Sequence, residues 1–283
     1  MSLGIAIKGP EGVVLAADSR VTLKAERPGE SIPIYFDNVT KLLSFGEDHT
    51  YVGAVTYGQA VIGLRTAYSY IPEFEETVLK KEKKARLTIN EFSKKLSDFF
   101  LSRWEKDMPK DYPGGDMMFI VAGYDEGSPY GRVFLFGIPK KPKPAEQQPK
   151  KDKHPGEEFG MTWGGQLQIA SRIIHGLDPQ AKEIIREKLK LDNKTFEMIN
   201  EELRKLQWQI PWQILPLQDC IDLATNIIRI TMAMQDVAIT VRGVGGLIEI
   251  ATITSTDGIR FVQKKRIHGE FTEDFYEDTI EGD

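Results

Sequence analysis

Two continuous apolar runs near the start of the chain constrain its fold most. Leu3–Lys8 and Val13–Ala17 are almost entirely apolar, and residues 9–12 between them, Gly-Pro-Glu-Gly, have the composition of a turn. A strand with one face in water alternates apolar and polar residues, whereas a run without alternation is typical of a strand buried on both faces. The sequence therefore predicts an N-terminal β-hairpin within a core.

Further elements follow in the order strands, two helices, strands, helices, strands. The apolar patterns predict strands at 41–45, 50–56, 117–124, 132–138, 247–253 and 259–262. They predict helices over 59–80, from Thr88 onward, and over most of 166–235. Thr88 and Glu91 have the spacing of a capping box, which marks the start of the second helix. Two stacked sheets with helices outside accommodate this order.

We expect one domain over residues 1–269, because the sequence contains no clear interdomain linker. Residues 139–155 hold 5 prolines and 6 lysines, so we expect a mobile surface loop there. This loop is alternatively a contact site for an acidic partner. Residues 179–215 read as a helical insertion, and residues 270–283 as an acidic tail.

The composition is that of an ordinary globular protein. The 283 residues are 41% hydrophobic, and the net charge of −5 gives no reason to expect binding to nucleic acid or to a membrane. We find no signal-peptide pattern and no long apolar run. The single cysteine, Cys220, is expected to be a buried packing residue; it excludes an internal disulfide and is typical of a reducing compartment, so we expect a cytoplasmic protein. The 4 histidines have no zinc-binding spacing, and we expect neither a metal nor a cofactor.

Four segments carry a resemblance to a known family. They are residues 4–22, which include Ala16-Ala17-Asp18-Ser19-Arg20, residues 38–42 (Asn-Val-Thr-Lys-Leu), residues 55–58 (Val-Thr-Tyr-Gly) and residues 243–251, which begin Gly-Val-Gly-Gly. In this order they resemble proteasome β subunits and their bacterial relatives, the HslV and Anbu peptidases. The resemblance implies an α+β fold, the four-layer αββα sandwich of the N-terminal nucleophile (Ntn) hydrolases.

The resemblance also implies a chemistry. In this family the hydroxyl of the first residue, usually threonine, attacks an amide carbonyl, and the α-amine of the same residue acts as the base. That amine suits the task because its unperturbed pKa is about 7.7–8.0. The substrate would be a peptide or protein, and the subunits would form a self-compartmentalising homo-oligomer. Whether a regulatory ATPase assists it is unknown from the sequence.

Carried over residue by residue, the family pattern gives five candidate site residues. Removal of Met1 would expose Ser2 as the nucleophile, and 16 positions separate Ser2 from Asp18, as the family spacing requires. Lys41 matches the active-site lysine, Gly58 the glycine whose N–H stabilises the oxyanion, and Asp236 a supporting aspartate. An alternative alignment on Gly4-Ile5 places Ser2 inside the strand and leaves no nucleophile. Asp18 and Lys41 would then be a structural ion pair.

The chain departs from the family near these residues. Val244 stands where a supporting serine is expected, and residues 162–166, Thr-Trp-Gly-Gly-Gln, replace a serine-rich turn. Three functions therefore stay open: a proteasome-like peptidase, an enzyme of the same fold that transfers an acyl group to an amine, and a non-catalytic assembly subunit. The last is favoured if Met1 stays on the chain.

Overall fold

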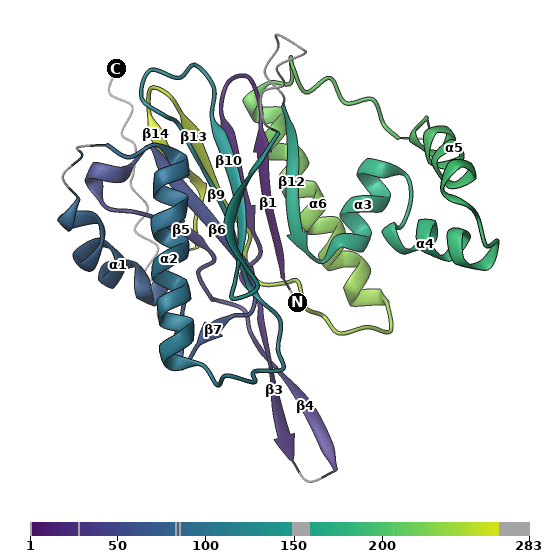
Figure 1. Ribbon diagram of the computed structural model, residues 1–283, viewed down its shortest axis with the longest axis horizontal. Coiled ribbons are helices and arrows are strands. Elements are labelled where there is room, and N and C mark those ends of the chain that lie inside the picture. The colour runs from purple at the N-terminus through teal and green to yellow at the C-terminus, as the bar shows by residue number, and fades with distance from the viewer. Residues whose placement is uncertain are drawn as a thin grey trace, which may run out of the picture.

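The computed structural model describes residues 2–27, 29–82, 84, 86–148, 159–205 and 207–265. The described chain is a mixture of helices and strands, with two five-stranded sheets and two short hairpins. Every strand pair in it is antiparallel. Figure 1 shows the two sheets packed against each other, with helices on the outer side of each.

The first sheet contains the predicted N-terminal hairpin at its centre. Its strands, in spatial order, are β12 (Gly160–Gly165), β1 (Leu3–Lys8), β2 (Val13–Ala17), β13 (Glu249–Thr254) and β14 (Gly258–Gln263). Every residue of β1 and β2 is buried. Leu15 contacts the other sheet, whereas Val14 and Ala16 contact helices, so both faces of β2 are apolar. This explains why the sequence does not alternate there.

The second sheet is built from the middle of the chain. Its strands, in spatial order, are β11 (Lys141–Gln147), β10 (Arg132–Ile138), β9 (Met117–Gly123), β6 (Val52–Gly58) and β5 (Leu42–Ser44). The strands predicted at 117–124, 132–138 and 50–56 are confirmed within a few residues. The short helix η1 (Glu47–His49) links β5 to β6.

Three apolar clusters hold the layers together. One lies between the sheets and joins Ala6 and Leu15 to Val55 and Ile120. A second lies between the second sheet and the helices α1 (Ile71–Thr77) and α2 (Ile89–Asp107). The third lies between the first sheet and the helices α3 (Leu167–His175) and α6 (Leu217–Val237). Helix α2 begins with the predicted capping box, in which Thr88 and Glu91 bond reciprocally.

The prediction of a loop over 139–155 is wrong for residues 141–147, because these residues form the edge strand β11. Leu135 of β10 pairs with Ala145, and Gly137 pairs with Lys141. Prolines occur on edge strands because the side without a neighbour needs no N–H donor, and Pro142 and Pro144 lie two positions apart on this edge. Residues 149–158 and the acidic segment 270–283 lie outside the described residues.

The prediction of a helix over 59–80 is also wrong for the first half of that range. Residues Val61–Ile62 (β7) and Arg65–Thr66 (β8) form a small hairpin, which is followed by η2 (Tyr68–Tyr70), α1 and η3 (Leu79–Lys81). Gly63, at the turn, has φ +58°, a left-handed conformation that breaks a helix. The Tyr70 hydroxyl donates to the Ile62 carbonyl at 3.2 Å and ties the hairpin to the helix.

Two parts of the fold extend beyond the layers. The hairpin of β3 (Val21–Arg27) and β4 (Glu30–Phe36), which the sequence analysis did not predict, projects from the body in Figure 1. Helices α4 (Pro179–Lys188) and α5 (Asn193–Arg204) form much of the expected helical segment 179–215, and α5 buries no residue. None of the described helices combines the length and apolar character needed to cross a membrane.

Candidate functional site

Antiparallel pairing brings four of the five candidate residues to one end of the paired sheets. Ser2 immediately precedes β1, Asp18 follows β2, Lys41 precedes β5, and Gly58 is the last residue of β6. Since neighbouring antiparallel strands start where their partners end, these residues meet although the first and the last are 56 positions apart in the sequence.

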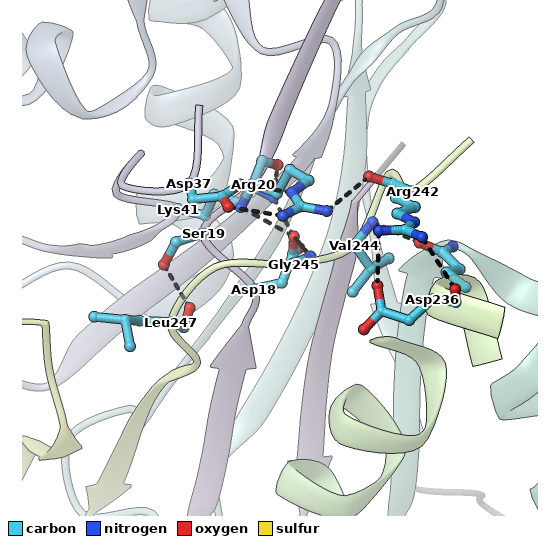
Figure 2. Close-up of polar contacts among 11 residues, drawn as sticks. Asp18, Ser19, Arg20, Asp37, Lys41, Asp236, Arg242, Val244, Gly245 and Leu247 are labelled. Atoms are coloured by element: carbon cyan, nitrogen blue, oxygen red, sulfur yellow. Dashed lines mark hydrogen bonds and ion pairs between the residues drawn. The ribbon is translucent and has the colours of Figure 1, made fainter. Parts of the chain in front are cut away.

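Asp18 is the most enclosed group of the site, with no exposed surface. Its Oδ1 accepts hydrogen bonds from the Leu3 N–H at 2.9 Å and from Lys41 Nζ at 2.8 Å. Its Oδ2 accepts from the N–H groups of Arg20 at 3.1 Å and Gly245 at 3.0 Å. The carboxylate thus joins β1 to the turn after β2, the segment before β5 and the loop before β13. Figure 2 shows its surroundings on the side of Arg20, Lys41 and Gly245.

Lys41 is 3% exposed and forms the predicted contact with Asp18. Its Nζ also donates to the Arg20 carbonyl at 2.5 Å. Burial lowers the pKa of Lys41 below its ordinary value, and the Asp18 carboxylate opposes this change. The side chain is therefore a cation held in a poorly solvated place by one carboxylate and one carbonyl.

Ser2 lines the same cavity as Lys41 and is 4% exposed. Its carbonyl accepts a hydrogen bond from the Gln166 N–H at 2.8 Å. Gly165 makes this approach possible, because a Cβ at that position would lie 1.8 Å from the Ser2 oxygen. Ser2, Lys41 and Gly58 line one cavity of about 10 Å³, the space of roughly one water molecule. Ser2 and Gly58 also line a neighbouring groove of about 1000 Å³.

Gly58 holds a backbone conformation that other residues rarely adopt. Its φ is +84°, and a Cβ there would lie 2.4 Å from the Asp116 carbonyl oxygen. The Thr56 N–H donates to the Lys41 carbonyl on the β5 side, and the Gln59 N–H donates to Asp116 on the β9 side. By strand alternation the Gly58 N–H points to the β5 side, where Lys41 and the cavity lie.

Asp236 does not line the cavity. It lies at the end of α6 with a side chain that is 62% exposed, and it faces Arg242 at 3.7 Å. The Arg242 carbonyl accepts from Arg20 Nη1 at 3.2 Å, which links Asp236 to the site through this loop (Figure 2), and the charge of Asp236 also helps to raise the pKa of Arg20.

The sequence analysis did not predict the ion pair between Arg20 and Asp37 beside the site, which we call the Arg20 clamp. The Arg20 guanidinium makes two bonds to Asp37, Nε–Oδ1 at 2.5 Å and Nη2–Oδ2 at 2.7 Å. It also lies over the Tyr35 ring, 5.2 Å from the centroid. The bond from Arg20 lowers the pKa of Asp37. Arg20 follows Asp18 by two positions, but nothing in the sequence identifies Asp37 as its partner.

Val244 and Trp163, which depart from the pattern that the sequence resembles, belong to the apolar cluster between the first sheet and helices α3 and α6. Val244 is buried, and its N–H donates to Gln235 Oε1 at 2.9 Å. Trp163 pairs with Ile5 across the β1–β12 ladder, and its ring lies 5.3 Å from that of His175. The buried Nε1 of Trp163 has no hydrogen-bond partner among the described residues.

Comparison with known proteins supports the fold alone. No family model matches the chain, and no curated protein is similar to it in sequence. A solved structure of the Gly-1 mutant of Anbu from Hyphomicrobium sp. strain MC1 is similar, with a TM-score of 0.53, 13% identity, and coverage of 95% of this chain and 88% of that chain. A second Anbu structure from the same organism gives a TM-score of 0.50 with the same identity and coverage. The chain therefore shares the fold of Anbu, one of the proteasome-like groups that its sequence motifs resemble.

Proposed function

We propose that this protein is an amide-bond hydrolase of the proteasome-like Ntn type, with the four-layer αββα sandwich of that class and Ser2 as its nucleophile. One observation carries the proposal: Ser2, Lys41 and Gly58 line the same cavity, and Lys41 is bound to the buried carboxylate of Asp18. A hydroxyl, a buried cation and a backbone N–H beside one small space are the groups that acyl transfer requires.

In the proposed mechanism, removal of Met1 frees the α-amine of Ser2. The Ser2 Oγ attacks the amide carbonyl carbon while its proton passes to the α-amine. The Gly58 N–H stabilises the oxyanion, and the leaving amine takes the proton as the C–N bond breaks. Water then hydrolyses the ester on Ser2. The positive charge of Lys41, held by Asp18, favours the deprotonated forms of Ser2.

The groove beside Ser2 supports a peptide or protein as substrate. Its volume of about 1000 Å³ is that of a site for a large ligand. Its walls come from three segments, and most of the side chains are apolar: Val21 and Leu23 of β3, Val61 and Leu64 around β7, and Met108, Pro109 and Pro113 after α2. An extended peptide fits such a groove better than a small polar metabolite.

A second candidate is transfer of the acyl group from Ser2 to an amine. Val244 and Trp163 motivate it, because they replace the hydroxyls that would support hydrolysis in proteasomes, and Val244 is buried at 2% exposure. Peptide products analysed with and without an added amine distinguish the two reactions, since only transfer yields a new amide.

We also propose that the protein forms a homo-oligomer. Large apolar side chains lie in solvent outside the layers, among them Trp208 at 76% and Ile214 at 74% exposure. Groups of this size are typical of interaction surfaces when they gather in patches. Sedimentation at micromolar concentration tests this: a strict monomer would contradict both the oligomer and a compartmentalised peptidase.

Labelling with a β-lactone tests the nucleophile. The wild-type protein should lack Met1 by intact mass and should carry the acyl adduct on the peptide that begins with Ser2. Ser2→Ala should lose the adduct, whereas Ser69→Ala, which removes an exposed hydroxyl elsewhere, should keep it. If Met1 remains, or if Ser2→Ala keeps full activity, the protein is better described as a non-catalytic assembly subunit.

A further inference from the structure

Asp107 is the only charged residue among the described residues that line the groove beside Ser2. The rest of this lining consists of apolar residues, such as Val61 and Met108, of glycines, and of uncharged polar residues, such as Tyr112. The described walls of the groove therefore carry one negative charge and no positive charge. A groove of this kind distinguishes ligands by their charge as well as by their shape.

The position of the Asp107 carboxylate is fixed from two sides. Asp107 is the last residue of α2, and its Oδ2 accepts a hydrogen bond at 3.2 Å from the hydroxyl of Tyr70, a residue that is 1% exposed. The same hydroxyl donates to the Ile62 carbonyl, so its one proton is shared between two acceptors. Gly63 lies against the other side, where an added Cβ would be 3.3 Å from the Asp107 Cβ. The core thus places the carboxylate, although Asp107 itself is exposed.

No cation forms an ion pair with Asp107 in the part of the chain that the structure describes. Arg103 lies one helical turn before it, at a spacing that often gives an ion pair. Its guanidinium instead binds Glu73 at 2.8 Å. Arg65, whose guanidinium lies over the Tyr70 ring, also binds Glu73, at 2.7 Å. Since Glu73 takes both arginines, the charge of Asp107 is left unpaired.

The end of α2 adds to this negative charge. The carboxyl end of a helix carries a partial negative charge, so a carboxylate at the last helical position is unfavourable for the helix. Lys106 and Lys110 are close to Asp107 in sequence, but neither lines the groove. A cation bound in the groove would relieve the repulsion between the carboxylate and the helix end.

We propose that Asp107 selects substrates with a basic side chain, arginine or lysine, and is a specificity-determining residue of the groove. The cationic head binds the carboxylate, and the methylene stem packs against apolar residues of the same walls, such as Val61 and Met108. This inference rests on the proposed function, because it names the substrate class of the same site. Asp107 takes no part in the chemistry at Ser2.

Cleavage of a panel of octapeptides tests the proposal. The peptides are blocked at both ends and built from alanine and leucine, with arginine, glutamine or glutamate at each position in turn, and mass spectrometry measures their products. For the best arginine peptide, kcat/KM should exceed that of its glutamine counterpart about 5- to 10-fold, between the effect of an exposed ion pair and that of a charge-assisted hydrogen bond. The difference should lie in KM and should shrink in high salt.

Asp107→Asn should remove the preference for arginine over glutamine. The asparagine oxygen can still accept from the Tyr70 hydroxyl, and an unchanged melting temperature checks that the fold is kept. Asp107→Lys should favour the glutamate peptide instead. The matched control is Asp111→Asn, which removes an exposed carboxylate four positions further on that does not line the groove, and it should keep the arginine preference.

Binding separates the failure of this inference from the failure of the proposed function. The same peptides, carrying an uncharged fluorophore, are titrated with Ser2→Ala, and anisotropy should show the arginine preference and its loss when Asp107→Asn is added. If the wild type cleaves no peptide but this binding preference holds, the proposed function fails and the selectivity of the groove stands. Equal binding of the arginine and glutamine peptides, no binding of either, or a preference that survives Asp107→Asn would overturn the inference.

Discussion

Asp18 and Lys41 are separated by 23 positions in the sequence and form a buried ion pair, with Oδ1 and Nζ 2.8 Å apart. The side chains are 0% and 4% exposed, respectively. Asp18 accepts three backbone hydrogen bonds besides, so its place is set even without the lysine. Lys41 depends on Asp18 and one carbonyl oxygen for its solvation.

Lys41→Ala should lower the free energy of unfolding by about 3–5 kcal/mol, because it leaves a buried carboxylate without its cation. Chemical denaturation measures the loss. Lys80→Ala removes one partner of an exposed pair with Glu76 and should change little. The double variant Asp18→Asn with Lys41→Met should recover much of the loss; an unchanged stability in Lys41→Ala would show that the pair is not buried in solution.

Gly58→Ala should destabilise the protein by more than the about 1–2 kcal/mol that a left-handed conformation costs an alanine, because its Cβ also meets the Asp116 carbonyl at 2.4 Å. Gly127→Ala is the matched control: its φ is +71°, and nothing lies within 4 Å of the added Cβ. Thermal unfolding compares the two. Acylation of Ser2 should slow only in Gly58→Ala, and equal effects of the two changes would contradict the cavity geometry.

Asp37→Asn should lower the stability of the protein in a way that depends on pH, because it removes the ion pair with Arg20. Arg20 lowers the pKa of Asp37, so the pair stabilises the fold above the ordinary carboxyl pKa of 3.8, and this contribution is lost as the pH falls through the lower, folded-state value. The melting temperature of the variant should therefore lie below that of the wild type at pH 7 and approach it in acid. Asp98→Asn, at an exposed site on α2, should show no such trend.

The Cys220 thiol should be inert in the folded protein. It is buried, and burial raises its pKa to about 11, so the reactive thiolate is scarce at pH 8. Iodoacetamide should alkylate it in urea and not in native buffer, as mass spectrometry can measure. Rapid alkylation of the native protein would mean that α6 opens away from the first sheet.

Where burial is uniform along a segment, the sequence alone was sufficient to predict the structure. Residues 3–17 lack alternation because both faces of β1 and β2 are covered, and the capping box at Thr88 needs no distant partner. Segments at the edges behaved differently. The prolines of β11 are compatible with a strand only because it lies at the rim of its sheet, and the sequence does not say which strand lies there.

The candidate site divides in the same way. Family motifs alone singled out Ser2, Asp18, Lys41 and Gly58, because these residues keep their spacing to strands whose ends must meet. Only the tertiary structure placed Asp236 at the surface and Asp37 against Arg20, and buried Glu249 at the start of β13. Local sequence determines which strands form, but the energy of a buried charge depends on every segment that packs around it, and that packing exists only in the folded chain.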